Sequence, residues 1–257
     1  MERVKTGIEG LDQALHGGIP KGNVVLISGS AGTGKTLICL SFIYHGATKF
    51  NEPGIYISTD QTPEELRLQA KNFGWDLEAL EKKNMLRLYH VDVTSEKDMQ
   101  YLKKLGKVAK EIKAKRIVLD SLTTVTEFLT PFEIRKGMKL FETLEAISPV
   151  PMTEAIVAKN VLMKIINYLK STGCTCLVTS ELPEEGQWLS RDTCSEFLAD
   201  GVILLRYFEY AVGKPRSLMV RKLRYSDHSS EPWDMIISKE GITVKPPEKG
   251  IVVPKLE

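Results

Sequence analysis

The chain has 257 residues, of which 42% are hydrophobic and 26% are charged. This composition is typical of a globular protein with room for one large α/β domain. The formal net charge is +2, so overall charge neither favours nor excludes nucleic acid as a ligand. No apolar stretch approaches the roughly 18 residues of a membrane span, and the first residues lack the apolar core of a signal peptide. We therefore expect a cytoplasmic protein without a membrane span.

The cysteines show no C-x-x-C pair and no partnering histidine at metal-binding spacing. Cys174 and Cys176 alternate along an expected strand, so they should share one face of it. We expect all the cysteines to be reduced core residues, with a metal site as the alternative. The four residues are Cys39, Cys174, Cys176 and Cys194.

The first part of the chain contains a phosphate-binding motif. Residues 6–22 are broken by glycines and a proline, with a candidate short helix at Leu11–Leu15. Asn23–Ser28 is an apolar, β-branched run that predicts a buried strand. Gly29–Thr36, GSAGTGKT, has the form G-x-x-x-x-G-K-[ST], and Leu37–His45 predicts a helix directly after it. Strand, glycine loop and helix in this order indicate a P-loop, or Walker A motif.

Each residue type in this loop suits a nucleoside triphosphate. The glycines let the backbone turn tightly, so that successive N–H groups and the helix N-terminus face phosphate oxygens. Lys35 would reach the β- and γ-phosphates, and the Thr36 hydroxyl would bind Mg²⁺. The alternative is a glycine-rich turn that only packs. The expected ATP-binding residues here are Gly29, Ser30, Ala31, Gly32, Thr33, Gly34, Lys35, Thr36 and Leu37.

A second motif lies at Lys115–Asp120, KRIVLD, an apolar strand with a basic start and a terminal acid. This resembles a Walker B strand. Ligands collect at the carboxyl ends of parallel strands, so Asp120 should lie beside the P-loop and hold Mg²⁺, through a water molecule. The alternative is an aspartate that only caps the next turn.

The rest of the chain alternates between expected strands and helices. That alternation predicts a mostly parallel sheet with helices on both faces, followed by an antiparallel hairpin. We expect one domain over residues 1–244, a helical insertion at about 131–152 and an extended tail at 245–257. The expected strands are Gly54–Thr59, Met85–Val93, Cys174–Ser180, Gly201–Phe208 and Arg216–Arg224. One expected helix starts at Thr62–Pro63 and ends near Asn72–Gly74. The next follows an N-cap at Ser95 and runs to about Ile112, and two more span Phe132–Ile147 and Thr153–Ser171.

Together these motifs resemble KaiC-type ATPases of the RecA superfamily, in a single-domain form of the archaeal type. Residues 6–18 match the pattern T-G-x-x-x-L-D-x-x-L-x-G-G that precedes Walker A in that family. The resemblance implies a RecA-like P-loop NTPase fold and a homo-oligomer, commonly a hexameric ring with ATP between neighbours. Further matches are Thr62–Pro63, Asn72–Leu77, Asp120–Ser121, Thr179–Glu181, Glu196–Phe197, Asp200 and Lys222–Arg224.

The resemblance also assigns residues that would reach ATP from a neighbouring subunit. Lys222 and Arg224 are two apart on a strand and share a face, and a Lys-x-Arg there contacts the γ-phosphate in the family. The alternatives are a solvated basic strand end or a nucleic-acid patch formed with Arg216 and Arg221. The other matching positions are Leu223, Ser226 and His228, and Asn72 joins the ATP-binding set.

The chain departs from the family where the attacking water is activated. The usual pair of glutamates is replaced by Asp60 and Gln61. Asp60 has a shorter carboxylate, and Gln61 can orient a water molecule but cannot take its proton. Glu181 is a rival base. We therefore expect slow hydrolysis, with Lys35, Asp60, Gln61 and Glu181 as the catalytic candidates.

These features favour an ATP-dependent switch that hydrolyses ATP slowly and acts on an unknown protein partner. A non-catalytic ATP-binding scaffold is the second hypothesis. A paralogue that binds single-stranded DNA near Trp188 and Arg191 is the third, weakened by the small net charge. Autokinase activity stays open.

Overall fold

The structure is a computed structural model that describes residues 1–93, 96–129, 154–184, 188–207 and 216–247. Three expected features lie outside these ranges: the helix Phe132–Ile147, the N-cap at Ser95 and the tail after residue 247. No helix among the described residues is long and apolar enough to cross a membrane.

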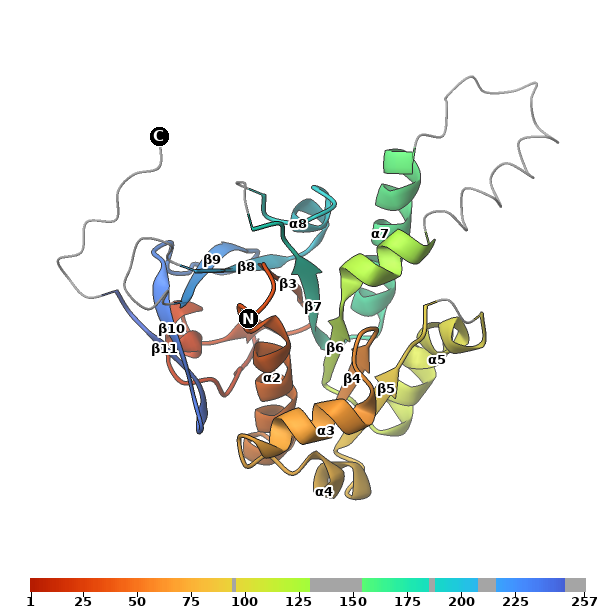
Figure 1. The fold of residues 1–257 in the computed structure, drawn as a ribbon, viewed down its shortest axis with the longest axis horizontal. Helices are drawn as coiled ribbons and strands as arrows, with labels where there is room; N and C mark the ends of the chain where they lie inside the picture. The colour runs from red at the N-terminus through yellow and green to blue at the C-terminus, as the bar shows by residue number, and fades with distance from the viewer. Residues whose placement is uncertain (94–95, 130–153, 185–187, 208–215, 248–257) are drawn as a thin grey trace.

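A nine-stranded sheet forms the centre of the molecule, in the order β11-β10-β9-β8-β3-β7-β6-β4-β5 (Figure 1). The strands from β8 to β5 run parallel to one another, whereas β9, β10 and β11 are antiparallel. The expected α/β fold with a mostly parallel sheet is confirmed. The strands are β3 (Val24–Gly29), β4 (Gly54–Ser58), β5 (Leu86–His90), β6 (Arg116–Asp120), β7 (Thr175–Glu181), β8 (Gly201–Tyr207), β9 (Arg216–Leu223), β10 (Trp233–Ser238) and β11 (Gly241–Lys245).

The antiparallel side is larger than the sequence predicts. The expected pair of strands exists as β8 and β9, but β10 and β11 extend it by two more strands. Gly241, with φ +117°, allows the tight turn between them, since this left-handed conformation favours glycine. A separate antiparallel pair, β1 (Arg3–Val4) and β2 (Ile19–Pro20), flanks the short helix α1 (Leu11–Ala14).

Helices cover both faces of the sheet, as expected (Figure 1). One apolar core joins α1, α2, α3 and α4 to side chains such as Ile27 and Val118. The other joins α5, α7 and the helix at residues 122–129 to the opposite side chains, such as Leu26 and Ile117. This alternation is what a sheet buried on both faces requires. The helices are α2 (Lys35–Lys49), α3 (Pro63–Lys71), α4 (Leu77–Lys82), α5 (Glu96–Glu111), α7 (Glu154–Ser171) and α8 (Ser195–Leu198).

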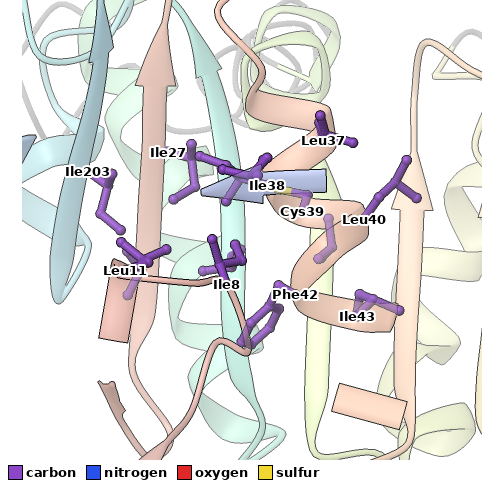
Figure 2. Packing of buried hydrophobic residues seen from close by; sticks show 14 of the residues in the cluster. Ile8, Leu11, Ile27, Leu37, Ile38, Cys39, Leu40, Phe42, Ile43 and Ile203 are labelled. Atoms are coloured by element: carbon purple, nitrogen blue, oxygen red, sulfur yellow. The ribbon is translucent and has the colours of Figure 1, made fainter. Parts of the chain in front are cut away.

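Helix α2 is buried on nearly all sides, which fits its continuous apolar sequence. It packs on the sheet through strands β3, β4, β6 and β7, and it also contacts β11. Figure 2 shows Ile8 and Leu11, from the segment before β3, lying close to Ile27 and Ile203 of the sheet and to Phe42 of α2. The N-terminal segment therefore belongs to the core that supports the P-loop helix.

Local signals place the helix ends where the sequence predicts them. Thr62 Oγ1 accepts from the Glu65 N–H at 3.3 Å, and the Glu65 carboxylate accepts from the Thr62 N–H at 2.8 Å. This capping box, with Pro63 in the first turn, fixes the start of α3. Gly74 and Gly173 follow α3 and α7 with φ +72°, the conformation that ends helices.

Three of the four cysteines are buried, and Cys194 is half-buried. All four are free thiols, and Cys174 and Cys176 lie in the same core, on one side of the sheet. The described residues contain no cluster of three or more histidines, cysteines, aspartates and glutamates that could hold a metal ion. Burial raises the pKa of the Cys39 thiol, and the nearby Asp120 charge adds to this effect, so Cys39 stays protonated in the core.

Arg116, at the start of β6, is fully buried rather than a solvated basic residue. Its guanidinium donates to the Glu52 carboxylate at 2.7 Å and to the carbonyls of Phe42 and Lys5 at 2.8 and 2.7 Å. It also stacks over the Phe42 ring at 4.4 Å. A buried cation of this kind is tolerated only when it is paired and hydrogen-bonded. Arg116 thus ties the N-terminal segment and α2 to the end of β6 that lies away from the P-loop.

Candidate functional site

The Walker A loop lies between the carboxyl end of β3 and the first turn of α2. Gly32 and Gly34 have φ +74° and +104°, which residues with a Cβ rarely adopt. Gly34 precedes α2 without a side-chain cap, so N–H groups of the first helical turn stay free for an anion. A Cβ on Gly29 would lie 2.6 Å from Thr33 Oγ1. A side chain at position 29 would therefore clash with the loop in its present shape.

Lys35 folds back onto this loop. Its side chain is 8% exposed, and Nζ donates to the carbonyls of Gly29 and Ser30 at 2.9 and 3.0 Å. Burial lowers the pKa of Lys35, while the charges of Glu181 and then Asp120 oppose this shift. A phosphate group entering the loop would supply a stronger, charged acceptor for the same ammonium group.

Asp120 accepts three hydroxyl groups from three different elements. Thr36 of α2 and Tyr56 of β4 donate to Oδ2 at 2.8 and 2.7 Å, and Thr179 of β7 donates to Oδ1 at 2.5 Å. Strand order explains the convergence, because β6 lies between β4 and β7. Burial, with the Asp120 charge, raises the pKa of Tyr56 well above its ordinary value, so this phenol remains a donor. Asp120 is 7% exposed, and the three hydroxyl groups orient its carboxylate.

The Thr36–Asp120 pair fits a magnesium ion. Mg²⁺ prefers oxygen ligands and keeps several waters, usually taking one or two protein groups plus substrate phosphates. The hydroxyl and the carboxylate lie within 2.8 Å of each other at the start of α2, next to the loop that would hold the phosphates. With no larger acidic cluster among the described residues, the remaining ligands would come from the nucleotide and water.

The positions expected to activate water lie just after β4, on the strand next to the one that ends at Asp120. Asp60 is exposed, and its Oδ1 accepts from Thr59 at 3.0 Å and from Thr124 at 3.4 Å. The N–H groups of Asp60 and Gln61 both donate to Ser58 Oγ, at 3.3 and 2.9 Å. Ser58 thereby turns the chain sharply after the strand. The structure thus brings Asp60 and Gln61 to the carboxyl edge of the sheet, on the strand next to the one that carries Asp120.

Glu181, the rival base, ends β7 directly opposite Gly29 in the parallel ladder. Its side chain is exposed, and its N–H donates to Thr123 Oγ1 at 3.2 Å. Among the charges that raise the pKa of Lys35, Glu181 has the largest effect and Asp60 the smallest. Glu181 is therefore as well placed as Asp60 to face a bound phosphate group.

Lys222 and Arg224 contact α8 of their own chain. Lys222 Nζ donates to the carbonyls of Glu196 and Ala199 at 2.8 and 2.7 Å. Arg224 pairs with Asp200 at 3.3 Å. Burial, and then the Arg224 charge, lowers the pKa of Lys222. Among the described residues, no hydrogen bond joins either cation to the Walker A loop. A contact with ATP bound by a neighbour stays a prediction.

The remaining positions taken from the resemblance are also away from the loop. The Leu223 side chain is 5% exposed in the core, so only its backbone could meet a ligand. Ser226 accepts from Arg3 at 2.7 Å, which links it to the N-terminal segment. His228 donates its N–H to the Asp227 carboxylate. These positions are the expected neighbour-facing residues, and their role is untested.

Asn72 lies at the end of α3. Trp75, three residues on, stacks on Tyr44 with ring centres 5.1 Å apart. Tyr44 is nine residues beyond Lys35 on α2, about 13 Å along the helix. Asn72 is therefore beside the far half of α2 rather than at the phosphate loop, and its assignment to ATP stays a prediction.

The sequence predicts no role at the P-loop for four residues near it, although Thr179 belongs to a stretch that matches the family. Tyr56 and Thr179 bind Asp120, as described above. Tyr207, at the end of β8, donates to the Gly32 carbonyl at 2.7 Å, and Arg216 Nε donates to the same oxygen at 3.3 Å. These contacts link positions more than 170 residues apart, and only the pairing of β8 with β3 brings them together.

Comparison with known proteins identifies the family of the chain. The family model for the KaiC ATPase matches residues 4–148 and 143–249, and the two stretches meet inside the expected insertion. The circadian clock oscillator protein KaiC of Prochlorococcus marinus is 29% identical over an alignment of 256 positions, which covers 96% of this chain but 46% of that protein. The chain thus spans about half the length of such relatives.

Two other relatives match over nearly their full length. The UPF0273 protein MJ1359 of Methanocaldococcus jannaschii is 31% identical, over 96% of this chain and 97% of that protein. The crystal structure of the KaiC-like protein PH0186 from Pyrococcus horikoshii superimposes with a TM-score of 0.77 at 32% identity, covering 95% of this chain and 99% of that one. The chain therefore belongs to the KaiC family of RecA-superfamily ATPases, as a single KaiC-like domain.

Proposed function

We propose that this chain binds Mg·ATP at Gly29–Thr36 and hydrolyses it slowly. The observation that carries the proposal is the contact between Thr36 and Asp120, which joins the Walker A and Walker B motifs into one oxygen site beside the loop. Thr36 and Asp120 would hold Mg²⁺, which would neutralise negative charge on the phosphate groups. Lys35, released from the loop carbonyls, would bind the same phosphates.

For hydrolysis the chain must also activate water. Asp60 and Glu181 are the carboxylates at the edge of the site, and either could accept the proton of the attacking water. Gln61 would orient that water without taking its proton. Because Asp60 is exposed and held by two hydroxyls only, we expect weak general-base catalysis and slow turnover.

The neighbour-facing residues support an oligomeric, nucleotide-dependent switch. Lys222 lies near the end of β9 and Arg224 directly follows that strand. Both cations could stabilise phosphate charge in an adjacent site. In the single chain they are held by α8 and Asp200. Binding of ATP by a neighbour would give them a new acceptor, so nucleotide state and assembly would be coupled. Assembly would change the surface that the chain presents to an unidentified protein partner.

The proposal is tested by measuring native mass with and without Mg·ATP, paired with phosphate release on the same sample. We expect a shift from small species to a closed oligomer on addition of Mg·ATP, together with slow phosphate release. A mass independent of nucleotide would contradict the oligomeric switch, and no bound nucleotide would contradict the site itself.

A second candidate, a non-catalytic ATP-binding scaffold, is favoured by the same exposed Asp60 and uncharged Gln61. It predicts tight ATP binding and nucleotide-dependent assembly with no turnover above a Lys35→Ala background. The DNA-binding alternative gains no support from the loop near Trp188, because Arg191 pairs with Glu127 at 2.9 Å.

A further inference from the structure

The tip of the Walker A loop is held from outside by two side chains. The Gly32 carbonyl accepts from the Tyr207 hydroxyl at 2.7 Å and from Arg216 Nε at 3.3 Å. Arg216 Nη2 also donates to the Tyr207 oxygen at 3.4 Å, and its guanidinium lies 5.2 Å from the centre of the Tyr207 ring. The loop carbonyl, the phenol and the guanidinium thus form one connected cluster.

We propose that Tyr207 and Arg216 are positioning residues that hold the Walker A loop in its phosphate-binding shape through the Gly32 carbonyl. This inference rests on the proposed function, because it concerns how the same loop binds ATP. Neither residue follows from the Walker motifs.

The geometry of the peptide group explains the effect. The Gly32 carbonyl and the Thr33 N–H belong to one planar trans peptide and point in opposite directions. Fixing the carbonyl on the outside therefore aims the Thr33 N–H toward the inside of the loop. That N–H makes only a long contact of 3.4 Å, to the Ser30 carbonyl, so a phosphate oxygen would be a better acceptor.

The two side chains are supported by the sheet rather than by the loop. Tyr207 and Arg216 are directly opposite each other in the antiparallel ladder of β8 and β9. Strand β8 also pairs with β3, where Leu205 is opposite Gly29, and Figure 1 shows the two strands side by side. A group placed by paired strands is held more precisely than one placed by a loop.

Side chains of the antiparallel strands lie close against this side of the loop. A Cβ on Gly32 would lie 3.0 Å from the Tyr207 oxygen, and a Cβ on Gly34 would lie 2.8 Å from the end of Met235 on β10. Both glycines also have positive φ. Strands β8, β9 and β10 therefore contact the outer side of the loop, opposite the side where its N–H groups would meet a nucleotide.

Tyr207 and Arg216 act as positioning residues, because their donor groups bind the Gly32 carbonyl rather than the nucleotide. Arg216 Nε and Nη2 are both engaged, with Gly32 and Tyr207. Both residues are half-buried at the end of their strands, so losing the phenol hydroxyl should change the stability of the whole chain little. It should change nucleotide affinity more.

The test compares Tyr207→Phe with Tyr168→Phe. Tyr168 is a matched control, because its hydroxyl also contacts the backbone of a glycine, accepting from the Gly106 N–H at 3.0 Å between α5 and α7. Each substitution removes one oxygen atom. The measurements are the dissociation constants of ATP and ADP, steady-state kcat and KM for phosphate release, and urea unfolding.

For Tyr207→Phe we expect both dissociation constants to rise by about 3- to 10-fold, the equivalent of one lost hydrogen bond. KM should rise in parallel while kcat stays within about 2-fold, because the loop binds ground state and transition state alike. Arg216→Gln should act in the same direction. Tyr168→Phe should lower stability to urea as much as Tyr207→Phe does, yet leave nucleotide affinity unchanged.

If nucleotide affinity in Tyr207→Phe stays within 2-fold of wild type, the positioning role is overturned but the proposed function is not. A fall in kcat at constant KM would have the same consequence. Equal affinity losses in Tyr168→Phe would overturn it too, since the effect would then be one of general stability. A wild-type chain that binds no nucleotide would overturn the proposed function, and this inference with it.

Discussion

Two neighbouring strand ends, those of β6 and β4, are built very differently. At the end of β6, Asp120 is 7% exposed and accepts hydroxyls from Thr36, Tyr56 and Thr179. At the end of β4, Asp60 is exposed, with its closest partner being the adjacent Thr59. The first end is fixed by three separate elements, whereas the second depends mostly on its own turn.

This difference bears on what the site does well. Groups that are fixed before the ligand arrives bind and catalyse without reorganisation cost, whereas loosely held groups lose part of their effect. The proposed phosphate and metal half of the site is complete within one chain. In the proposed water-activating half, the usual pair of glutamates is replaced. Asp60 is shorter than glutamate by one methylene, and Gln61 has no carboxylate. We therefore expect the chain to bind ATP tightly and to hydrolyse it slowly.

The largest effect should come from Asp120→Asn. This change removes the charge beside Thr36 while keeping the shape, so Mg²⁺-dependent phosphate release should fall by about 100-fold or more. ATP affinity measured without Mg²⁺ should change little. The matched control is Asp76→Asn, which weakens only the first turn of α4. Mg²⁺ dependence unchanged in Asp120→Asn would show that the metal lies elsewhere.

Gln61→Glu should remove much of the difference between the two strand ends. The added carboxylate restores a general base beside the expected water, so phosphate release should rise by about 10-fold or more. ATP affinity should stay near wild type, because Gln61 is not expected to touch the phosphates. Phosphate release measured at saturating ATP decides the matter. An unchanged rate would count against placing Gln61 next to the water.

Thr124→Val should have a smaller effect. The Thr124 hydroxyl donates to Asp60 at 3.4 Å and contacts Ser121 Oγ at 2.8 Å, so its loss should let Asp60 move. Phosphate release should fall by about 2- to 5-fold at constant ATP affinity. Thr126→Val is the control, since its hydroxyl donates to the Leu122 carbonyl instead. If only Glu181→Gln lowers the rate, Glu181 is the base and Asp60 is not.

The smallest effect concerns stability rather than activity. Burial, with the charges of Lys49 and then Arg116, lowers the pKa of His45 from its ordinary 6.5 to about 4. Between these values the unfolded chain binds a proton that the folded chain does not. The free energy of unfolding should therefore be retained above pH 6.5 and fall as the pH drops toward 4. We expect a fall of about 2 kcal/mol, less than the full shift would give, because His45 is only partly buried and solvent weakens the effect.

His45→Gln should flatten that part of the stability profile, and His16→Gln should not, since the His16 side chain is 48% exposed. Chemical unfolding at several pH values provides the measurement. ATP affinity at pH 7 should be the same in both variants, because His45 lies on the far half of α2. A profile equally steep in His45→Gln and wild type would assign the acid sensitivity to other groups.

Much of the parallel half of the fold is predictable from local sequence. Gly29–Thr36 and Asp120 sit where apolar strands end, and the alternation of strands and helices places both at one edge of a parallel sheet. Thr62, Pro63 and Gly173 mark helix ends because their effects on the backbone are local. These signals act within a few residues and so are visible in one sequence.

The rest depends on contacts between distant segments. The basic start of β6 carries no local signal of burial, yet Arg116 is fully buried, because Glu52 and two carbonyls from separate segments accept from its guanidinium. Tyr207 reaches Gly32 only because β8 pairs with β3. Strands β10 and β11 gain their stability from pairing with each other and with β9. No local pattern encodes such pairings.

The central claim is that the Walker A loop holds ATP firmly while the chain splits it slowly. The most direct measurement is ATP binding and phosphate release on the same sample, for wild type and Lys35→Ala. We predict that wild type binds Mg·ATP and releases phosphate well below about 1 s⁻¹, the low end for enzymes, and that Lys35→Ala does neither. Equal binding and equal phosphate release in the two proteins would contradict the account.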